Sequence, residues 1–465
     1  MALFDNSTQT ILFTAPWEPV TVRRGDALGF RALADRFADG LAPDLTNRTR
    51  DARWITILSW CLERSHAVWA KVGGRAVSTR ANARQRYAWL RPLELMWIAR
   101  TILVADADWR GRQLAGQRRV RWWIESDRRT SRFAMSDEQF RAYRQTGMYG
   151  AYRVLFRRLA GMTVGKDGWT PSDGAHGLSS WLDGKLGRSA PDDVDDGIIR
   201  SSKWPGREDE WWLKTWPAFG DGRSDVTLPR KRDDFSPLPE GDRLDKLLFR
   251  EGSRSARRAL VASLVDGAEE ADHLALCDVV VRGLRKEPDH ERLRSLPAFS
   301  RLADAGMEVM DQIATTLQSD RGGLRVAVTT LARQDAVAEA CEELRQAAKA
   351  WKAIEHASSL PKVETVDAFA ASVCVGNAGE RLQRLLTHHE LHGGGLRWFV
   401  LRKGEVVART LPSGESSSRY RFRLWSLARL GAQCGRVAEV PKALIEDVGS
   451  LVDDPAGEED EASPG

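Results

Sequence analysis

The chain has 465 residues, of which 42% are hydrophobic and 29% charged, and its formal net charge is +5. A single hydrophobic core rarely grows beyond about 250–300 residues, so we expect two or three domains. No apolar run reaches the roughly 18 residues of a membrane-spanning helix, and we therefore expect neither a membrane span nor a membrane partner.

Cysteine usage and the first residues both favour a cytoplasmic protein. The five cysteines are odd in number, far apart and without a Cys-x-x-Cys pair: Cys61, Cys277, Cys341, Cys374 and Cys434. This pattern predicts buried thiols in a reducing compartment rather than a disulfide framework or a cysteine-bound zinc. The segment Met1–Asp5 lacks the basic and apolar regions of a signal peptide. We expect a cytoplasmic location.

The chain begins with a short extended pattern followed by helices. Residues 1–25 predict a short β lead-in. Asp26 is a suitable N-cap for a helix that extends to Leu41, and a second amphipathic helix runs from Thr49 to Trp69. Apolar residues recur at helical spacing in both, so the tryptophans of this region are expected to fill a core.

The stretch from Arg75 to Arg158 concentrates positive charge. It holds 19 arginines, no lysine and seven acidic residues, a net charge of about +12, so the rest of the chain sums to about −7. Tryptophans are interleaved with these arginines: Trp89, Trp97, Trp109, Trp122 and Trp123. Guanidinium groups bind phosphate bidentately and stack on aromatic rings, a combination that suits nucleic acid.

Three uses fit this stretch at the level of sequence. It can form a polyanion-binding surface, an interface with an acidic partner protein, or a set of ion pairs with the acidic remainder of the chain. The Ala, Gly and Arg content also fits a high-GC bacterial source, which explains the choice of arginine but not its clustering.

No pattern in the chain specifies a catalytic reaction or a cofactor. The segment Gly161–Asp167 looks like a phosphate-binding loop, but its glycines are one residue too close and Asp167 replaces the hydroxyl residue that binds magnesium. Serine–histidine–acid and paired-carboxylate arrangements are absent as well. We predict no catalytic residue and no cofactor, and we regard an enzyme as the less favoured class.

The second half of the chain predicts successive helices and then a distinct C-terminal unit. Residues 324–356 read as one long helix with many small residues. A helix over 365–374, a turn at Gly376–Gly379 and a helix over 380–392 precede two alternating segments around Lys403-Gly404, the pattern of a tight hairpin. This order is that of a winged-helix module, in which residues 380–392 would enter a groove and Arg402 and Lys403 would form the wing tip. The alternative is a helical cap with an incidental hairpin.

Two histidines in the same unit are the candidates for a metal site that we consider most closely. His388 and His392 are four residues apart and share a helical face, but they lack the His-Glu start of a zincin motif and have no third ligand nearby in sequence. Histidines near a helix C-terminus are more often placed there by the helix dipole. The pair is a weak metal candidate, and we predict no metal.

Two short segments carry a resemblance to a known group of proteins. Leu45–Trp54 and Tyr420–Trp425 resemble segments of mostly helical, uncharacterised proteins from bacterial phage-defence gene clusters. They cover less than a tenth of the chain and contain no functional motif. The resemblance implies a DNA-related accessory role and antiviral defence as its setting, and it transfers no catalytic residue.

These observations together predict a mainly α, multi-domain helical protein with a short β lead-in and a C-terminal helix–helix–hairpin, winged-helix-like unit. The predicted divisions are a Trp/Arg-rich helical domain (1–185), an irregular linker (186–240), a helical bundle or scaffold (241–357), a helix-turn-helix plus hairpin unit (358–440) and a disordered acidic tail (451–465).

The predicted function is a nucleic-acid-associated accessory protein that binds DNA or RNA phosphates through an Arg/Trp-rich surface, together with other protein subunits of a complex. The alternatives are a scaffold subunit that docks an acidic partner and an unrecognised metal-dependent enzyme. The residues predicted to bind nucleic acid are Arg110, Arg112, Arg118, Arg119, Arg121, Trp122, Trp123, Arg128, Arg129, Arg132, Arg402 and Lys403.

The acidic tail should be dispensable for folding. Residues 451–465 contain six acidic residues and few apolar ones, so packing them would not offset the entropy of ordering them. Truncation after Ser450 should leave the melting temperature unchanged within error, as measured by circular dichroism. A fall of several degrees would show that the tail packs on the folded protein.

Overall fold

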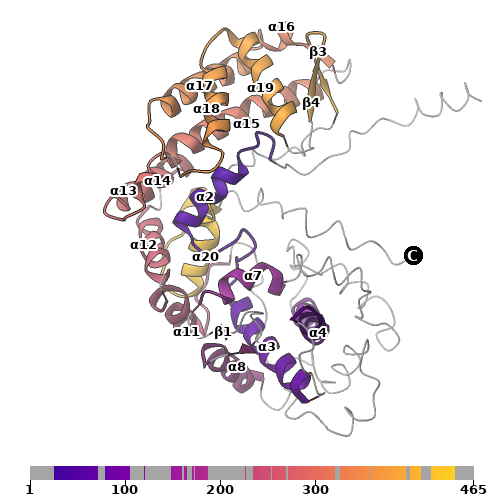
Figure 1. The fold of residues 1–465 in the computed structure, drawn as a ribbon, viewed down its shortest axis with the longest axis vertical. Coiled ribbons are helices and arrows are strands. Elements are labelled where there is room, and N and C mark those ends of the chain that lie inside the picture. The colour runs from indigo at the N-terminus through magenta and orange to yellow at the C-terminus, as the bar shows by residue number, and fades with distance from the viewer. Residues whose placement is uncertain are drawn as a thin grey trace, which may run out of the picture. The chain divides into compact units, whose positions relative to one another are not determined.

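The structure is a computed structural model of the whole chain (Figure 1). It describes residues 26–71, 79–104, 120, 148–159, 162–164, 170–171, 173–186, 226, 234–252, 254–268, 271–319, 325–357, 359–393, 398–409 and 420–445. The predicted β lead-in, most of the predicted linker 186–240 and the acidic tail lie outside these residues. The protein is mainly helical, as predicted, with a small antiparallel sheet.

The chain forms two compact units, each built from segments distant in sequence. Unit 1 contains residues 1–37 and 284–420, and unit 2 contains residues 38–283 and 421–465. The helix–helix–hairpin segment predicted as a separate module therefore belongs to the same unit as the helices before it, because α17 (Asp335–Lys352) packs against α18 (Val363–Val373). None of the described helices is long and apolar enough to cross a membrane.

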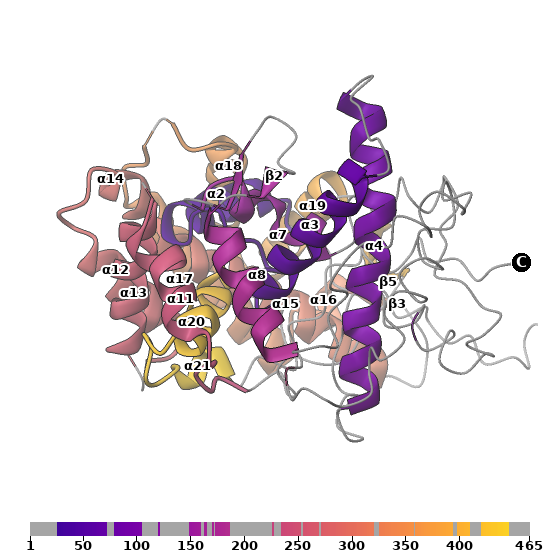
Figure 2. The same cartoon turned by 90° about the horizontal axis from the view of Figure 1, so that it is seen from below.

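Unit 2 is helical apart from one short strand pair. Its described elements are the end of α2 (Arg31–Leu41), α3 (Arg53–Lys71), α4 (Thr79–Val104), α7 (Met148–Phe156), β1 (Thr163–Val164), β2 (Thr170–Pro171), α8 (Asp173–Leu186), α11 (Gly241–Asp245), the π-helical turn η3 (Lys246–Arg250), α12 (Ser255–Asp266), α13 (His273–Gly283), α20 (Leu424–Gln433) and α21 (Lys442–Ile445). Helix α3 packs against both α8 and α4 (Figure 2).

Tryptophans fill the core between these helices, as their spacing predicted. Trp60 of α3 and Trp97 of α4 are fully buried and meet edge to face, with ring centroids 6.0 Å apart. The indole N–H of Trp60 donates to Asp183 of α8 over 2.7 Å. Burial of the rings and satisfaction of this polar atom together fix α3 against its neighbours.

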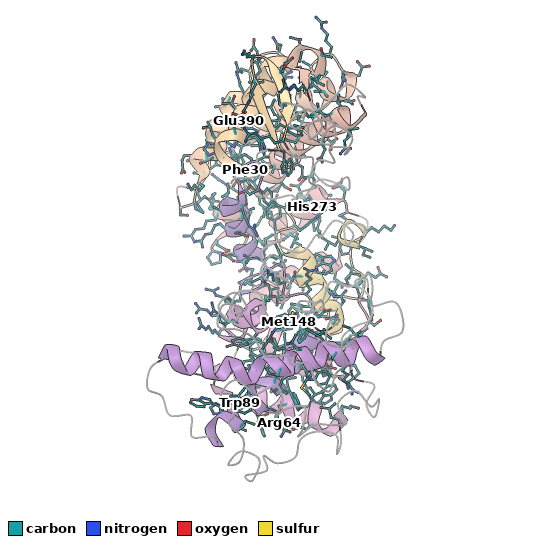
Figure 3. The ribbon with its side chains drawn as sticks, turned by 90° about the vertical axis from the view of Figure 1, so that its right-hand side faces the viewer. Phe30, Arg64, Trp89, Met148, His273 and Glu390 are labelled. Atoms are coloured by element: carbon teal, nitrogen blue, oxygen red, sulfur yellow. The ribbon has the colours of Figure 1, made fainter. Side chains whose placement is uncertain are left out.

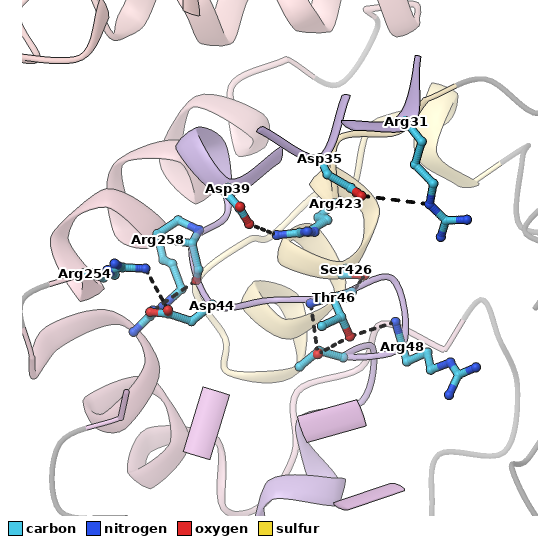
Figure 4. A network of polar contacts seen from close by, with 12 residues as sticks. Arg31, Asp35, Asp39, Asp44, Thr46, Arg48, Arg254, Arg258, Arg423 and Ser426 are labelled. Carbon is cyan, nitrogen blue, oxygen red and sulfur yellow. Dashed lines mark hydrogen bonds and ion pairs between the residues drawn. The ribbon is translucent and has the colours of Figure 1, made fainter. Parts of the chain in front are cut away.

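One ion pair and one hydrogen bond tie helix α20 to the loop before α3. Arg429 donates to Asp51 over 2.7 Å, and the backbone N–H of Ala52 donates to Gln433 over 2.7 Å. Nearby, Arg423 pairs with Asp39, and Asp44 accepts from Arg254 over 2.8 Å (Figure 4). Residues of the segments Leu45–Trp54 and Tyr420–Trp425 also meet here, because the guanidinium of Arg50 lies over the ring of Trp425, 5.8 Å from its centroid. Ser426, the next residue, donates to the carbonyl of Thr46 over 3.3 Å.

Unit 1 combines helices with a three-stranded sheet. Its described elements are the start of α2, α14 (His290–Leu293), α15 (Leu296–Ser319), β3 (Arg325–Ala327), α16 (Val328–Leu331), α17, α18, α19 (Ala378–His392), β4 (Phe399–Arg402) and β5 (Glu405–Ala408). The strands are antiparallel in the order β3-β5-β4, and Arg402 lies opposite Glu405 at the hairpin end. Figure 1 shows the sheet beside α16 and α19.

One predicted helix is wrong. Residues 324–356 form β3, the single turn α16 and helix α17 rather than one long helix. The backbone of Arg325–Ala327 pairs with β5, some 80 residues later in the chain. Local helical spacing could not anticipate this pairing, because strand partners distant in sequence leave no local pattern.

The segment before α2 is clamped against the end of α19. Gly29 has a φ of +72°, and a Cβ atom built there would lie 2.7 Å from the Cβ of His392 and 2.8 Å from its carbonyl oxygen. Glycine is therefore required both for its backbone conformation and for the close approach of the two segments.

Gly29→Ala should destabilise unit 1 by about 2–4 kcal/mol, because it adds left-handed backbone strain to a steric overlap. Urea unfolding measures this change. Gly184→Ala is the control: a Cβ on that exposed α8 residue meets no atom within 4 Å, so it should stabilise the helix by up to about 1 kcal/mol. Equal changes in the free energy of unfolding for the two substitutions would contradict the close approach of Gly29 to His392.

Candidate nucleic-acid interface

Most of the predicted binding surface lies outside the described residues. This applies to Arg110, Arg112, Arg118, Arg119, Arg121, Trp122, Trp123, Arg128, Arg129 and Arg132. Within the same basic stretch the structure describes the side chains of Arg91, Arg100, Arg153, Arg157 and Arg158. The first two are buried, Arg153 is half-buried in α7, and the last two are exposed on the turn after α7.

The buried arginines of the stretch have internal partners. Arg91 pairs with the fully buried Glu94, at 3.4 Å, and Arg100 donates to the carbonyl of Val226 over 3.2 Å. Arg91 is therefore paired within the chain, although its partner belongs to the basic stretch itself and not to the acidic remainder.

The tryptophans of the stretch that the structure describes are not available for stacking on bases. Trp89, labelled in Figure 3, and Trp97 are both fully buried in the core around α4. Between them, Glu94 accepts a hydrogen bond from the backbone N–H of Tyr149, in the first turn of α7, over 2.8 Å. Burial raises the pKa of Glu94 to about 7, against the opposing effects of Arg91 and this N–H. These groups hold α4 to α7.

The two helices predicted on either side of the Gly376 turn are formed, as α18 and α19. Asn377 caps α19, and its side chain accepts from the N–H of Glu380 over 3.0 Å. Both arginines of α19 close the turn: Arg384 donates to the carbonyls of Ser372 and Val375, each over 2.9 Å, and Arg381 donates to the carbonyl of Gly376 over 2.9 Å. These bonds satisfy carbonyls at the C-terminus of α18 that have no partner within the helix.

The outward face of α19 consequently carries little positive charge. Its exposed residues are Glu380, Gln383, Thr387, Leu391 and His392, and Leu391 is 73% exposed. Glu380 stands in the first turn of the helix, where a bound phosphate would meet its negative charge. Residues 380–392 were predicted to enter a groove, but both arginines of this helix donate to carbonyls of the turn before it.

The hairpin that follows is formed as predicted, with Lys403 and Gly404 at its tip. Their φ angles are +50° and +81°, the combination that a two-residue type I′ turn requires. Asparagine and glycine are the usual residues there, so Lys403 occupies a strained position. Arg402 and Lys403 are both exposed, and the space around Gly404 is open.

Two further basic residues lie on the same sheet and were not predicted. Arg325 of β3 lies opposite Val407, and Arg409 continues β5 through a 2.8 Å backbone bond to Trp398. Both are exposed. No local pattern marks Arg325, because the partner of its strand lies some 80 residues later, whereas Arg409 directly follows the second predicted hairpin segment and could have been found from it.

Helix α19 packs against β4, an edge strand of the sheet, and holds the hairpin in place. The backbone N–H of Leu401 donates to Glu390 over 2.6 Å, and that of Trp398 donates to His389 over 3.0 Å. The N–H of Val328 donates to the carbonyl of Gly404 over 2.9 Å. The sheet is therefore a rigid support for its exposed side chains.

The histidines of α19 have structural roles. Nε2 of His388 bonds to the carbonyl of Leu28 over 2.9 Å, and Nδ1 of His389 bonds to the carbonyl of Ala27 over 2.8 Å. The ring of His388 also packs against Phe30 and Phe369. The ring of His392 lies beside that of His388, with centroids 4.5 Å apart. Because Nε2 of His388 is bonded to a carbonyl, the geometry does not favour His388 and His392 as a metal pair.

Among the described residues, no group of three or more histidine, cysteine, aspartate or glutamate side chains is arranged to hold a metal ion. All five cysteines are buried free thiols. No protein-family model, curated protein or solved structure matches the chain.

Acidification should destabilise unit 1 through His388. Burial lowers the pKa of His388 to about 4, so the unfolded chain binds a proton at this residue between pH 6.5 and 4 while the folded chain does not. Its stabilising contribution is present above pH 6.5 and is lost as the pH falls toward 4. From pH 7 to pH 5 the loss should be about 1–2 kcal/mol in urea unfolding.

His388→Gln should reduce this pH-dependent loss, because glutamine can donate to the Leu28 carbonyl without titrating. His392→Gln, which replaces an exposed imidazole one turn later, should retain it. An unchanged pH dependence in His388→Gln would contradict the assignment.

Proposed function

We propose that this protein is a nucleic-acid-associated accessory protein, in a bacterial defence or DNA-processing system, that binds nucleic-acid phosphates through exposed arginines. The observation that carries the proposal is the segregation of charge: about +12 in Arg75–Arg158 within a chain of net charge +5. Counterion release makes such a concentration of cations attractive to any nucleic acid.

The described part of the basic stretch supports the proposal only at its C-terminal end. Arg91 and Arg100 are buried and bonded to groups inside the protein, whereas Arg157 and Arg158 are exposed. Unit 1 offers a second, independent support: two helices joined by a turn precede a hairpin whose tip residues, Arg402 and Lys403, are exposed and basic. We propose that this unit acts as a winged-helix-like module.

A scaffold function is the second candidate, and one observation favours it. The exposed face of α19 carries the 73% exposed Leu391 and no unpaired arginine, a composition more suited to a protein partner than to phosphate. In that case the protein would act as a subunit of a complex, and its basic stretch would dock an acidic partner protein.

Binding measurements across a salt series distinguish the two functions. The full-length chain should bind nucleic acid with an affinity that falls steeply between 50 and 200 mM salt, by on the order of a thousandfold if six phosphates are contacted. Changing Arg118, Arg119 and Arg121 together to Glu should weaken binding to all sequences and flatten the salt dependence. Fluorescence anisotropy with labelled duplex DNA, single-stranded DNA and RNA measures both effects.

A matched control removes the same charge elsewhere. Arg285, Lys286 and Lys349 are exposed residues of unit 1, and their triple change to Glu should weaken binding much less. Absence of salt-sensitive binding to all three nucleic acids would overturn the proposal and favour the scaffold.

A further inference from the structure

The three-stranded sheet of unit 1 presents a basic face. Residues paired across neighbouring strands lie on the same side of a sheet, and side chains alternate along each strand. Val406 and Ala408 of β5 are buried, so Glu405, Val407 and Arg409 lie on the outward side. Arg325 pairs with Val407 and Arg402 pairs with Glu405, which brings both arginines to that side as well.

Four cations and one carboxylate therefore occupy this face and its tip: Arg325, Arg402, Lys403, Arg409 and Glu405. All four basic side chains are exposed, and within the described residues none of them forms an ion pair. Unit 1 has a near balance of positive and negative residues elsewhere in its described part, so the sheet is its local concentration of positive charge.

Helix α19 lacks the features of a helix that reads DNA. Arg381 and Arg384 are bonded to the carbonyls of the α18–α19 turn, and Glu380 occupies the N-terminal turn. Its end is also covered, because His388 and His389 bind the segment before α2. The exposed cations available in this part of unit 1 to contact nucleic acid are therefore those of the sheet.

The sheet suits a duplex rather than a single strand. Binding of single strands relies on exposed aromatic rings that stack on bases, and both aromatic residues at the start of β4, Trp398 and Phe399, are fully buried. A two-stranded β-ribbon fits the major groove of B-form DNA, whereas the major groove of A-form RNA is deep and narrow.

Lys403 is an unusual residue for its position. It adopts a left-handed backbone conformation that asparagine or glycine would adopt with less strain. The side chain projects from an open tip, since a Cβ on the adjacent Gly404 would meet no atom within 4 Å. Strain retained at an exposed cationic tip is a feature of functional rather than structural positions.

We propose that the outward face and tip of the β3-β5-β4 sheet, and not helix α19, dock onto the phosphate backbone of duplex DNA. This inference rests on the proposed nucleic-acid function and assigns one contact surface and one substrate class to it. Arg325, Arg402 and Arg409 contact phosphates along the face, and Lys403 contacts a phosphate at the tip.

The test compares two variants of the full-length chain that lose the same charge. The sheet variant carries R325Q, R402Q, K403N and R409Q, and the control variant carries R285Q, K286Q, R292Q and K349Q on exposed sites of unit 1 away from the sheet. The sheet variant should bind a 30-base-pair duplex at least about 30-fold more weakly at 100 mM salt, with a salt slope smaller by about 2–4. The control variant should stay within about threefold of wild type.

The single variant K403N separates a binding role from a structural one. It should raise the melting temperature by about 1–3 °C, because asparagine relieves turn strain, and weaken duplex binding by about three- to tenfold. A higher melting temperature with unchanged affinity would overturn the inference. Circular dichroism of every variant shows that it is folded.

Several outcomes separate failure of this inference from failure of the proposed function. Loss of affinity in Gln383→Ala/Thr387→Ala but not in the sheet variant would assign the contact to α19 and overturn the inference alone. Equal affinity of the sheet variant and wild type, with loss of affinity only in the Arg118/Arg119/Arg121 variant, would also overturn the inference alone.

Other outcomes concern the substrate. Tighter binding of single-stranded DNA or duplex RNA than of duplex DNA, lost in the sheet variant, would overturn the choice of duplex DNA. Wild-type protein that binds no nucleic acid would remove the proposed function itself.

Discussion

A single buried imidazole connects the parts of unit 1 on which the basic sheet depends. Nδ1 of His389 bonds to the carbonyl of Ala27, and Nε2 accepts the N–H of Trp398. A neutral ring can donate through one nitrogen and accept through the other, and burial lowers the pKa of His389 in keeping with that state. The segment before α2, helix α19 and strand β4 are thereby held by one side chain.

This use of polar groups in the interior decides which surfaces remain for recognition. In α19 both arginines donate to carbonyls of the turn and two histidines bind a backbone segment, so the exposed face of the helix carries no arginine that is free to meet a phosphate. In unit 2, Arg91 is likewise paired with buried Glu94. A basic side chain can contribute to nucleic-acid binding only where it is not already bonded to a carbonyl or carboxylate of the protein, as on the outward face of the sheet.

Local sequence patterns were sufficient for elements defined by neighbouring residues. Apolar spacing predicted the helices of both units, the break around Gly376 separated α18 from α19, and Lys403-Gly404 marked the hairpin turn. Each of these depends on residues only a few positions apart, so periodicity and turn chemistry contain the necessary information. Strand β3 has three residues and a partner some 80 positions away, and for this reason its helical interpretation was wrong.

The sequence by itself determined that the protein is mainly helical, that its tryptophans near α3 and α4 form a core, and that a basic tip ends the hairpin. Tertiary structure alone decided which charges are exposed. Whether Arg384 meets a phosphate or the carbonyl of Ser372 depends on the position of α18, and whether Arg325 joins Arg402 depends on pairing through β5. Residue type determines which groups a side chain can bind. Only the packing of distant segments determines which of those groups lies within hydrogen-bond distance.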